Sequence, residues 1–127
     1  MKQINSYIKN KILRGVFMNL DFSYNYDNNN KIWDVVVLGE IDIYNSNELR
    51  ENLLNLVEKS KNSIHIDFRS LEYIDSTGLG ALVSVQKKVK EYNGHISLKN
   101  LTPNVKKIFK MTSLDKIFVI EEGVSNE

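Results

Sequence analysis

The sequence predicts an α/β fold, with a mixed, mostly parallel sheet of about five strands and helices packed on it. Two observations carry this prediction. Segments with the two-residue alternation of half-buried strands alternate along the chain with segments whose apolar residues recur at the spacing of helices. The chain is also 127 residues long, which is the length of one domain and leaves no room for a second. Strands that are repeatedly followed by helices are typical of parallel sheets.

The first two strands are predicted to be antiparallel. Residues 19–26 alternate apolar and polar side chains, as in a half-buried or edge strand. Asp27 and three asparagines follow and predict a turn, after which residues 32–38 form the second strand. The consecutive apolar residues Val35 to Leu38 are typical of a strand covered on both faces. We therefore expect the second strand to be central and the first to lie at an edge of the sheet.

Three helices are predicted, each from a terminal signal and apolar residues at helical spacing. Asn45 stands three residues before Glu48, as in a capping box, so the first helix begins near Asn45. The second helix follows Asp75 and ends at Asn93-Gly94, where glycine supplies the left-handed residue. The third begins after Thr102, an N-cap that precedes proline. The remaining strands are predicted at residues 64–68, 96–98 and 117–120.

Residues 1–18 depart from this pattern. They carry four basic residues, no acid, and isoleucines at four-residue spacing. We expect them to be a peripheral extension before a domain at residues 19–127, either disordered or added by the choice of start codon, because Met18 directly precedes the first strand. The other interpretation is a short amphipathic helix that binds weakly to a membrane surface or a partner.

The composition limits the classes of function. Seventeen basic and sixteen acidic residues leave a formal charge of +1, so the overall charge favours neither nucleic acid nor a membrane as partner. The absence of cysteine excludes disulfides, thiolate catalysis and Cys-ligated metal sites, and it fits a reducing compartment. No apolar run approaches the roughly 18 residues of a membrane span. We expect a cytoplasmic protein that binds its partner through a local surface.

Two places in the predicted fold are candidates for a site. In open sheets of parallel strands, sites form where strands give way to helices. Those places are Gly39 to Asp42, after the second strand, and Leu71 to Thr77, the turn that leads into the second helix.

The segment Leu71 to Leu82, L-E-Y-I-D-S-T-G-L-G-A-L, is the strongest functional signal. It places the Ser76 hydroxyl at a helix N-terminus, where unpaired N–H groups and the helix dipole favour a phosphate. Gly78 and Gly80 remove side chains from the first turn, although each costs up to about 1 kcal/mol of helix stability. The same residues also fit an ordinary capped helix whose glycines ease packing, and both interpretations stay open.

No enzymatic or cofactor motif accompanies these places. The single D-S-T-G lacks the second copy of an aspartic protease and carries an inserted residue. His65 and His95 lie in or beside predicted strands, and they provide neither the base of a serine hydrolase nor a metal-ligand set. A dinucleotide or P-loop glycine motif is missing. A two-component receiver domain would need an acidic pair where this chain has Asp27 and asparagines. We expect no catalysis, cofactor or metal.

Three segments match those of a known family. They are V-V-L-G-E-I-D at Val36 to Asp42, Y-I-D-S-T-G-L-G at Tyr73 to Gly80, and L-T-P-N-V-K-K-I-F at Leu101 to Phe109. On these segments the sequence resembles the STAS domain family, specifically the bacterial anti-sigma-factor antagonists, from about residue 19 to residue 120. Relatives usually end with a further helix. This chain stops seven residues after Ile120, so we expect that helix to be absent or reduced to a turn.

The resemblance implies a protein-binding switch. Ser76 corresponds to the serine that a partner kinase phosphorylates, with Thr77 as a less favoured acceptor, and that kinase is itself the anti-sigma factor. The unphosphorylated form binds the kinase and releases the sigma factor, and a serine/threonine phosphatase resets the switch. The implied partner-binding residues are Gly39, Glu40, Asp42, Asp75, Thr77, Gly78, Leu79 and Ile108. For Leu79 and Ile108, core packing is the alternative.

A second function stays open on the sequence. The chain is alternatively a STAS subunit that acts as a scaffold in a lipid-transport complex or a stressosome-like assembly, in which Ser76 is never phosphorylated. The intact D-S-T-G-L-G segment together with the G-E-I-D loop favours the switch.

Overall fold

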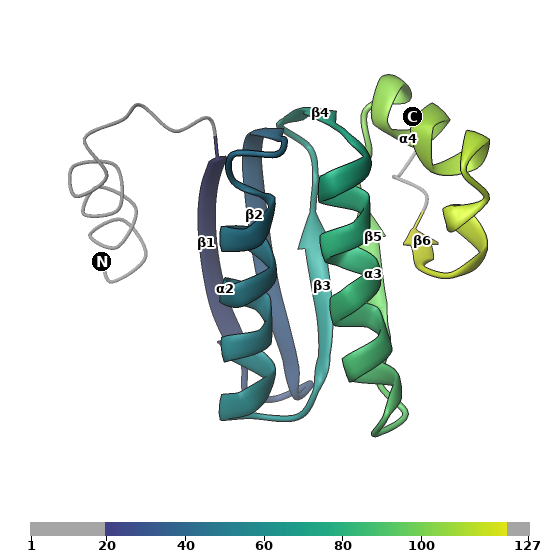
Figure 1. Ribbon diagram of the computed structural model, residues 1–127. Coiled ribbons are helices and arrows are strands. Elements are labelled where there is room, and N and C mark those ends of the chain that lie inside the picture. The colour runs from purple at the N-terminus through teal and green to yellow at the C-terminus, as the bar shows by residue number, and fades with distance from the viewer. Residues whose placement is uncertain (1–19, 122–127) are drawn as a thin grey trace, which may run out of the picture.

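The computed structural model of the protein describes residues 20–121, which form a six-stranded sheet with its helices (Figure 1). The strands are β1 (Leu20–Asp27), β2 (Ile32–Ile41), β3 (Ser63–Asp67), β4 (Leu71–Ile74), β5 (Ile96–Lys99) and β6 (Val119–Glu121). The helices are α2 (Ser46–Lys59), α3 (Ser76–Lys90) and α4 (Pro103–Met111), and a short 3-10 helix, η1 (Leu114–Lys116), precedes β6. Within residues 20–121, every helix is too short or too polar to cross a membrane. The predicted extension at residues 1–18 and the expected loss of a final helix fall on residues outside this range.

The sheet is mixed and mostly parallel, which confirms the predicted fold class. Its order is β1-β2-β3-β5-β6, and β4 pairs with β2. Among the described strands, β1 and β2 form an antiparallel pair, and the other four pairs are parallel. Asp27 closes the turn between β1 and β2, because its Oδ1 accepts the N–H groups of Asn29 at 3.0 Å and Asn30 at 3.1 Å.

The strand β4 lies where the sequence analysis expected only a turn. Its first and last residues are buried and the two between them are exposed, so the two-residue alternation of a strand is missing. It pairs in parallel with the end of β2, where Gly39 is opposite Leu71 and Ile41 is opposite Ile74. The segment that leads into α3 is therefore a strand up to Ile74 and turns at Asp75.

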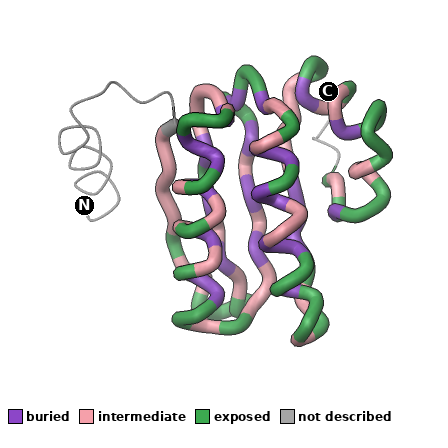
Figure 2. Tube along the Cα trace, in the orientation of Figure 1, coloured by how far each residue is buried: buried purple, intermediate pink, exposed green. Residues whose placement is uncertain are grey.

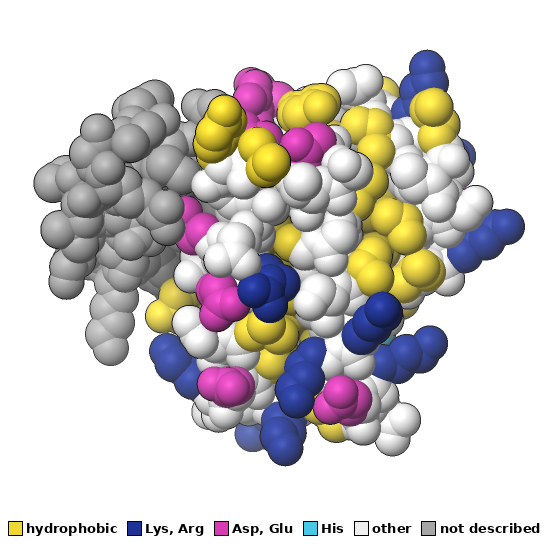
Figure 3. Space-filling view, in the orientation of Figure 1, with side chains coloured by type: hydrophobic (Ala, Val, Ile, Leu, Met, Phe, Trp, Pro, Cys, Tyr) yellow, Lys and Arg dark blue, Asp and Glu magenta, His cyan; other side chains and the backbone are white. Residues whose placement is uncertain are grey.

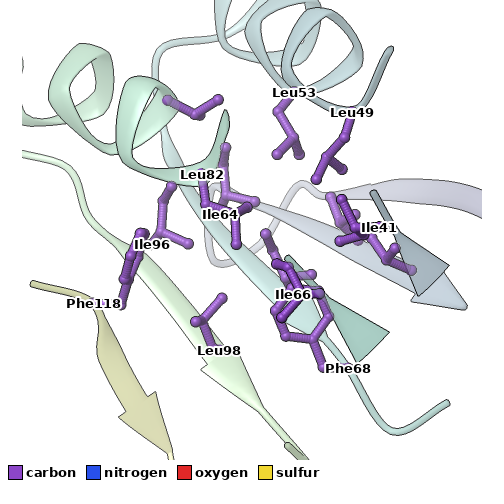
Figure 4. Close-up of a cluster of buried hydrophobic side chains, with 14 of the residues drawn as sticks. Ile41, Leu49, Leu53, Ile64, Ile66, Phe68, Leu82, Ile96, Leu98 and Phe118 are labelled. Carbon is purple, nitrogen blue, oxygen red and sulfur yellow. The ribbon is translucent and has the colours of Figure 1, made fainter. Parts of the chain in front are cut away.

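The core lies between the sheet and the helices α2 and α3, which lie side by side on one face of the sheet (Figures 1 and 2). Strands and helices both contribute side chains that are almost completely buried (Figure 4). Each buried Leu, Ile or Phe side chain stabilises the fold by about 1.5–3 kcal/mol relative to an exposed one. The buried residues labelled in Figure 4 are Ile41, Leu49, Leu53, Ile64, Ile66, Phe68, Leu82, Ile96, Leu98 and Phe118.

The prediction that β2 is covered on both faces is wrong, although its central position is confirmed. Val35 and Val37 are buried, whereas Val36, which points to the opposite face, is 37% exposed. Because α2 and α3 lie on the same face of the sheet, the run of valines reflects the preference of β-branched residues for strands as much as burial.

The capping signals of α3 and α4 are confirmed, and the end of α3 differs from the prediction. Asp75 and Thr102 cap these helices with side-chain oxygens, and Thr102 Oγ1 accepts the Val105 N–H at 3.4 Å. After α3 the left-handed residue is Asn93, with a φ of 65°, rather than Gly94. Asparagine enters this region more readily than most residues because its short polar side chain bonds locally.

Candidate functional site

Two chain segments meet at the carboxyl ends of β2 and β4. The β2–α2 loop starts after Ile41, and Asp75 joins β4 to α3. The Asp75 N–H donates to the Ile41 carbonyl at 3.1 Å, and the Gly39 N–H donates to the Ser70 carbonyl at 2.9 Å. These bonds hold the segments side by side. The two places that the sequence predicts as sites are therefore a single place in the fold.

The backbone conformation at residue 39 favours glycine. Its φ is 86°, in the left-handed region that glycine enters without steric cost. The pairing of β2 with β4 also shifts register between Gly39 and Glu40, so the end of β2 is irregular. The predicted contact of Gly39 with a partner stays a prediction.

Asp75 caps α3 and carries a negative charge. Its Oδ1 accepts hydrogen bonds from the Thr77 N–H at 2.9 Å, the Gly78 N–H at 3.1 Å and the Thr77 hydroxyl at 2.6 Å. Burial alone would raise the pKa of Asp75, but hydrogen bonds from Thr77, Gly78 and the Ile43 N–H outweigh burial and lower it. The bond from Ile43 joins this cap to the β2–α2 loop. A carboxylate therefore lies directly beside Ser76 at neutral pH.

Ser76 is the first residue of α3, and its side chain is exposed. The neighbouring Thr77 is only half-exposed, and its hydroxyl donates to the Asp75 carboxylate. Of the two hydroxyl groups in this motif, the one on Ser76 is more accessible to a visiting enzyme. This geometry favours the predicted acceptor over its alternative.

The glycines of the first turn of α3 have different surroundings. A Cβ on Gly78 would lie 2.6 Å from Ile41 Cγ2 and 2.7 Å from Ile74 Cγ1, whereas nothing lies within 4 Å of a Cβ on Gly80. Leu79 is 7% exposed and belongs to the core. Gly78 thus lets α3 approach β2 and β4 closely. At Gly78 and Leu79 packing explains the residue type, and a contact with a partner stays a prediction.

The predicted capping box of α2 is not formed, because the Asn45 side chain bonds backward into the loop. Asn45 Oδ1 accepts the Asp42 N–H at 2.9 Å, and Asn45 Nδ2 donates to the Glu40 carbonyl at 2.9 Å. Asn45 makes no side-chain cap bond to α2 and is 1% exposed. It therefore holds the start of the loop, which carries Asp42, against the end of β2, which carries Glu40. Both are predicted partner-binding residues, whereas Asn45 itself is buried.

The β2–α2 loop exposes large apolar side chains that the sequence analysis did not single out. Ile43 is 67% exposed, Tyr44 is 83% exposed, and Tyr73 of β4 is 44% exposed. We call these three residues the loop-tip surface. Tyr73 is opposite Glu40 at the end of β2, from which the loop leads, and exposed apolar groups in one region mark interaction sites. The available signal was an Ile-Tyr pair between Asp42 and Asn45, in a segment without helical or strand periodicity.

Acidic residues flank the two loops that lead into α2 and α3. Acidic side chains lie with hydrophobic ones at the end of the molecule where these helices begin (Figure 3). The acidic residues in or beside the two loops are Glu40, Asp42, Glu72 and Asp75. The other ends of the helices carry charges of both signs, and Lys88 lies 3.4 Å from Glu91 there. The charged residues at or just after these ends are Glu58, Lys59, Lys61, Lys87, Lys88, Lys90 and Glu91.

Ile108 lies apart from this assembly. It is half-buried on α4 and packs against the core. Figure 1 shows α4 and the β2–α2 loop on opposite sides of α3. The structure brings Gly39, Glu40, Asp42 and Asp75 together with the first turn of α3, and the predicted partner contact of Ile108, on a different helix, stays a prediction.

Comparison with known proteins identifies a matching family and a named relative. The STAS domain family matches residues 24–126. The anti-sigma-B factor antagonist of Bacillus subtilis (strain 168) is 39% identical over 86 residues, which are 68% of this chain and 78% of that protein.

Solved structures give the same architecture. The unphosphorylated form of SpoIIAA, an anti-sigma factor antagonist, matches with a TM-score of 0.70 at 19% identity, over 82% of this chain and 89% of that chain. The phosphorylated form of SpoIIAA, a Bacillus cell fate determinant, matches with a TM-score of 0.63 at 18% identity, over 82% and 92% of the two chains. At these identities the likeness shows the fold.

Proposed function

Because the chain belongs to the STAS domain family and, within it, to the bacterial anti-sigma-factor antagonists, we propose that it binds an anti-sigma factor and so releases a sigma factor. The observation that carries the proposal is the exposed Ser76 at the start of α3, beside a loop that presents apolar and acidic side chains. The role is binding rather than catalysis, in the manner of the antagonists of this family. The proposal places the protein in the cytoplasm, where sigma factors act.

The binding is switched by phosphorylation of Ser76. In the proposed cycle the anti-sigma factor is itself a serine kinase, it binds the unphosphorylated chain, and a serine/threonine phosphatase restores that form. Two features support Ser76 as the acceptor. Its side chain is exposed, and it lies in the first turn of a 15-residue helix, where backbone N–H groups and the dipole stabilise negative charge. A phosphate is therefore compatible with the folded chain.

The loop-tip surface supplies the apolar part of the proposed interface. Tyr44 and Ile43 are more than half exposed, so a partner buries large apolar side chains that the free protein leaves in water. Asp42 lies in the same loop and Glu40 lies near the end of β2, and both add negative charge. We infer an anti-sigma factor surface with an apolar hollow that receives these side chains.

We expect the cognate serine kinase to place one phosphate on the chain, at Ser76. The measurement is incubation with the kinase and ATP, followed by mass spectrometry of the peptide that spans Ser76. In Ser76→Ala the incorporation is expected to disappear, because Thr77 is engaged with Asp75. Phosphate on another residue, or undiminished phosphate in Ser76→Ala, would contradict the assignment. Binding to the kinase without any phosphate transfer would instead favour the scaffold function.

Replacing Tyr44 with serine is expected to weaken binding to the anti-sigma factor about tenfold. Truncated aromatic anchors in interfaces typically cost 1–2 kcal/mol or more, and tenfold corresponds to about 1.4 kcal/mol. Tyr44 is 83% exposed, so the free energy of unfolding should change by less than about 0.5 kcal/mol. Titration calorimetry measures the affinity. Ile117→Ser, at a residue that is 45% exposed beyond α4, is the control and should bind like wild type. Equal affinity of Tyr44→Ser and wild type would remove the loop-tip surface from the interface.

A further inference from the structure

The N-terminal halves of α2 and α3 enclose a shallow groove next to the proposed phosphorylation site. Its volume is about 270 Å³. Gly80 keeps it open, because nothing lies within 4 Å of where a Cβ would be. The residues that line the groove are Ser46, Asn47, Arg50, Thr77, Gly80 and Ala81. Arg50 is the one cation among them, so the groove has a single basic group, contributed by α2 and facing the first turn of α3.

The guanidinium of Arg50 is held by weak, exchangeable contacts. Its Nη2 donates to Asn47 Oδ1 at 2.8 Å and lies 3.0 Å from Glu51 Oε2. Both acceptors belong to α2 itself, and the side chains of Arg50 and Glu51 are 36% and 54% exposed. Ion pairs this exposed contribute little, because water and salt screen them. A doubly charged group within reach would therefore replace Glu51 as the partner of Arg50.

Ser76 directly precedes Thr77, one of the lining residues, so we infer that it lies at the α3 edge of the groove. Residues four apart lie on one face of a helix, so Ser76 and Gly80 share a face of α3. Gly80 and Thr77, the residue after Ser76, both line the groove. A phosphate on Ser76 would extend from the serine over the open space that Gly80 leaves. The planar fork of an arginine binds two phosphate oxygens at once, which a lysine cannot do.

We propose that Arg50 binds the phosphoryl group of phosphorylated Ser76 within the same chain and so links α2 to α3. The inference rests on the proposed phosphorylation of Ser76 and adds a residue that receives the product. Asp75 directly precedes Ser76 and Glu51 is the ion-pair partner of Arg50, and Arg50 offsets the repulsion that Asp75 exerts on the phosphate. The contact stabilises the inactive form and shields the phosphate from hydrolysis by the phosphatase.

The test uses the full chain with phosphoserine installed at position 76 during synthesis, so no kinase is needed. Phosphorus NMR follows the second pKa of the phosphoserine, which is ordinarily near 6. We expect this pKa to be at least about half a unit lower in the wild-type background than in Arg50→Gln, because a cation favours the dianion. Arg50→Lys should recover part of the difference. Lys87→Gln removes an exposed charge far along α3 and is the matched control, expected to titrate like wild type.

A second readout separates this contact from a general effect on folding. The phosphoserine should raise the melting temperature of the wild-type chain more than that of Arg50→Gln, each compared with its own unphosphorylated form. If the phosphoserine titrates identically in both backgrounds and raises both melting temperatures equally, the contact does not exist. Failure of the kinase to modify Ser76 would overturn the proposed function and leave this result standing. If the kinase phosphorylates Ser76 but the Arg50 contact is absent, the proposed function stands and this inference is wrong.

Discussion

Replacing Gly78 with alanine is expected to lower the free energy of unfolding by about 1–2 kcal/mol, although alanine is the better helix former. The added Cβ would lie 2.6 Å from Ile41 Cγ2 and 2.7 Å from Ile74 Cγ1, well inside van der Waals contact. Ile41 and Ile74 are 0% and 1% exposed, so neither side chain can move aside without repacking the core. The steric cost therefore exceeds the gain of about 1 kcal/mol in helix propensity.

Gly80→Ala is the matched control for this substitution. It lies two residues further along the same helix, and nothing is within 4 Å of its Cβ position, so it should stabilise the protein by up to about 1 kcal/mol. Urea unfolding followed by circular dichroism measures both changes. If Gly78→Ala lowers the free energy of unfolding and Gly80→Ala raises it, the glycine at position 78 is required for packing. If both variants were more stable than wild type, the contact at Gly78 would be too loose to matter, and the predicted partner contact there would gain weight.

The pattern of this sequence predicts the fold class well because the core is built from regular periodicities. The helices α2 and α3 repeat leucine and valine at three- and four-residue spacing, and these residues are the ones that face the sheet. β4 escaped prediction because it is four residues long and exposes Glu72 and Tyr73 in succession. Its pairing with β2 is a long-range contact that no local pattern contains. The exposure of Val36 was also not predictable from a local pattern, because it depends on which face of the sheet the helices cover.

The candidate site was predictable where it depends on local chemistry. A capping aspartate, a serine at the first helical position and a glycine at the end of a strand act within a few residues, and the structure places Asp75, Ser76 and Gly39 accordingly. The role of Asn45 was not predictable in this way. Its spacing from Glu48 indicates a capping box, yet its amide bonds to Asp42 and to the Glu40 carbonyl, because the loop folds back over it.

Replacing Ser76 with aspartate is expected to weaken binding to the anti-sigma factor about a hundredfold while leaving the fold intact. In an interface, one added charge at roughly 6 Å from a like charge costs about 2–3 kcal/mol at an effective dielectric near 20, which is about a hundredfold in affinity. Asp75 supplies that neighbouring charge, since its pKa is lowered and it is ionised at neutral pH. Water screens the repulsion between the two carboxylates in the free chain, whereas a docked partner excludes that water and strengthens the repulsion. In the free chain, aspartate at the start of α3 is favourable, because it interacts with the helix dipole.

Calorimetric titrations of three variants with the anti-sigma factor distinguish the effect of losing the Ser76 hydroxyl from the effect of adding a negative charge at residue 76. Ser76→Ala removes the hydroxyl without adding charge and should bind within a few-fold of wild type, whereas Ser76→Asp should lose most of its affinity. Asn55→Asp adds the same charge on an exposed position of α2, away from the site, and should bind like wild type. Equal weakening by alanine and aspartate would mean that the lost hydroxyl, rather than repulsion, controls binding. Aspartate that binds as tightly as serine would show that charge at this helix terminus is harmless to the interface, and the electrostatic basis of the switch would be wrong.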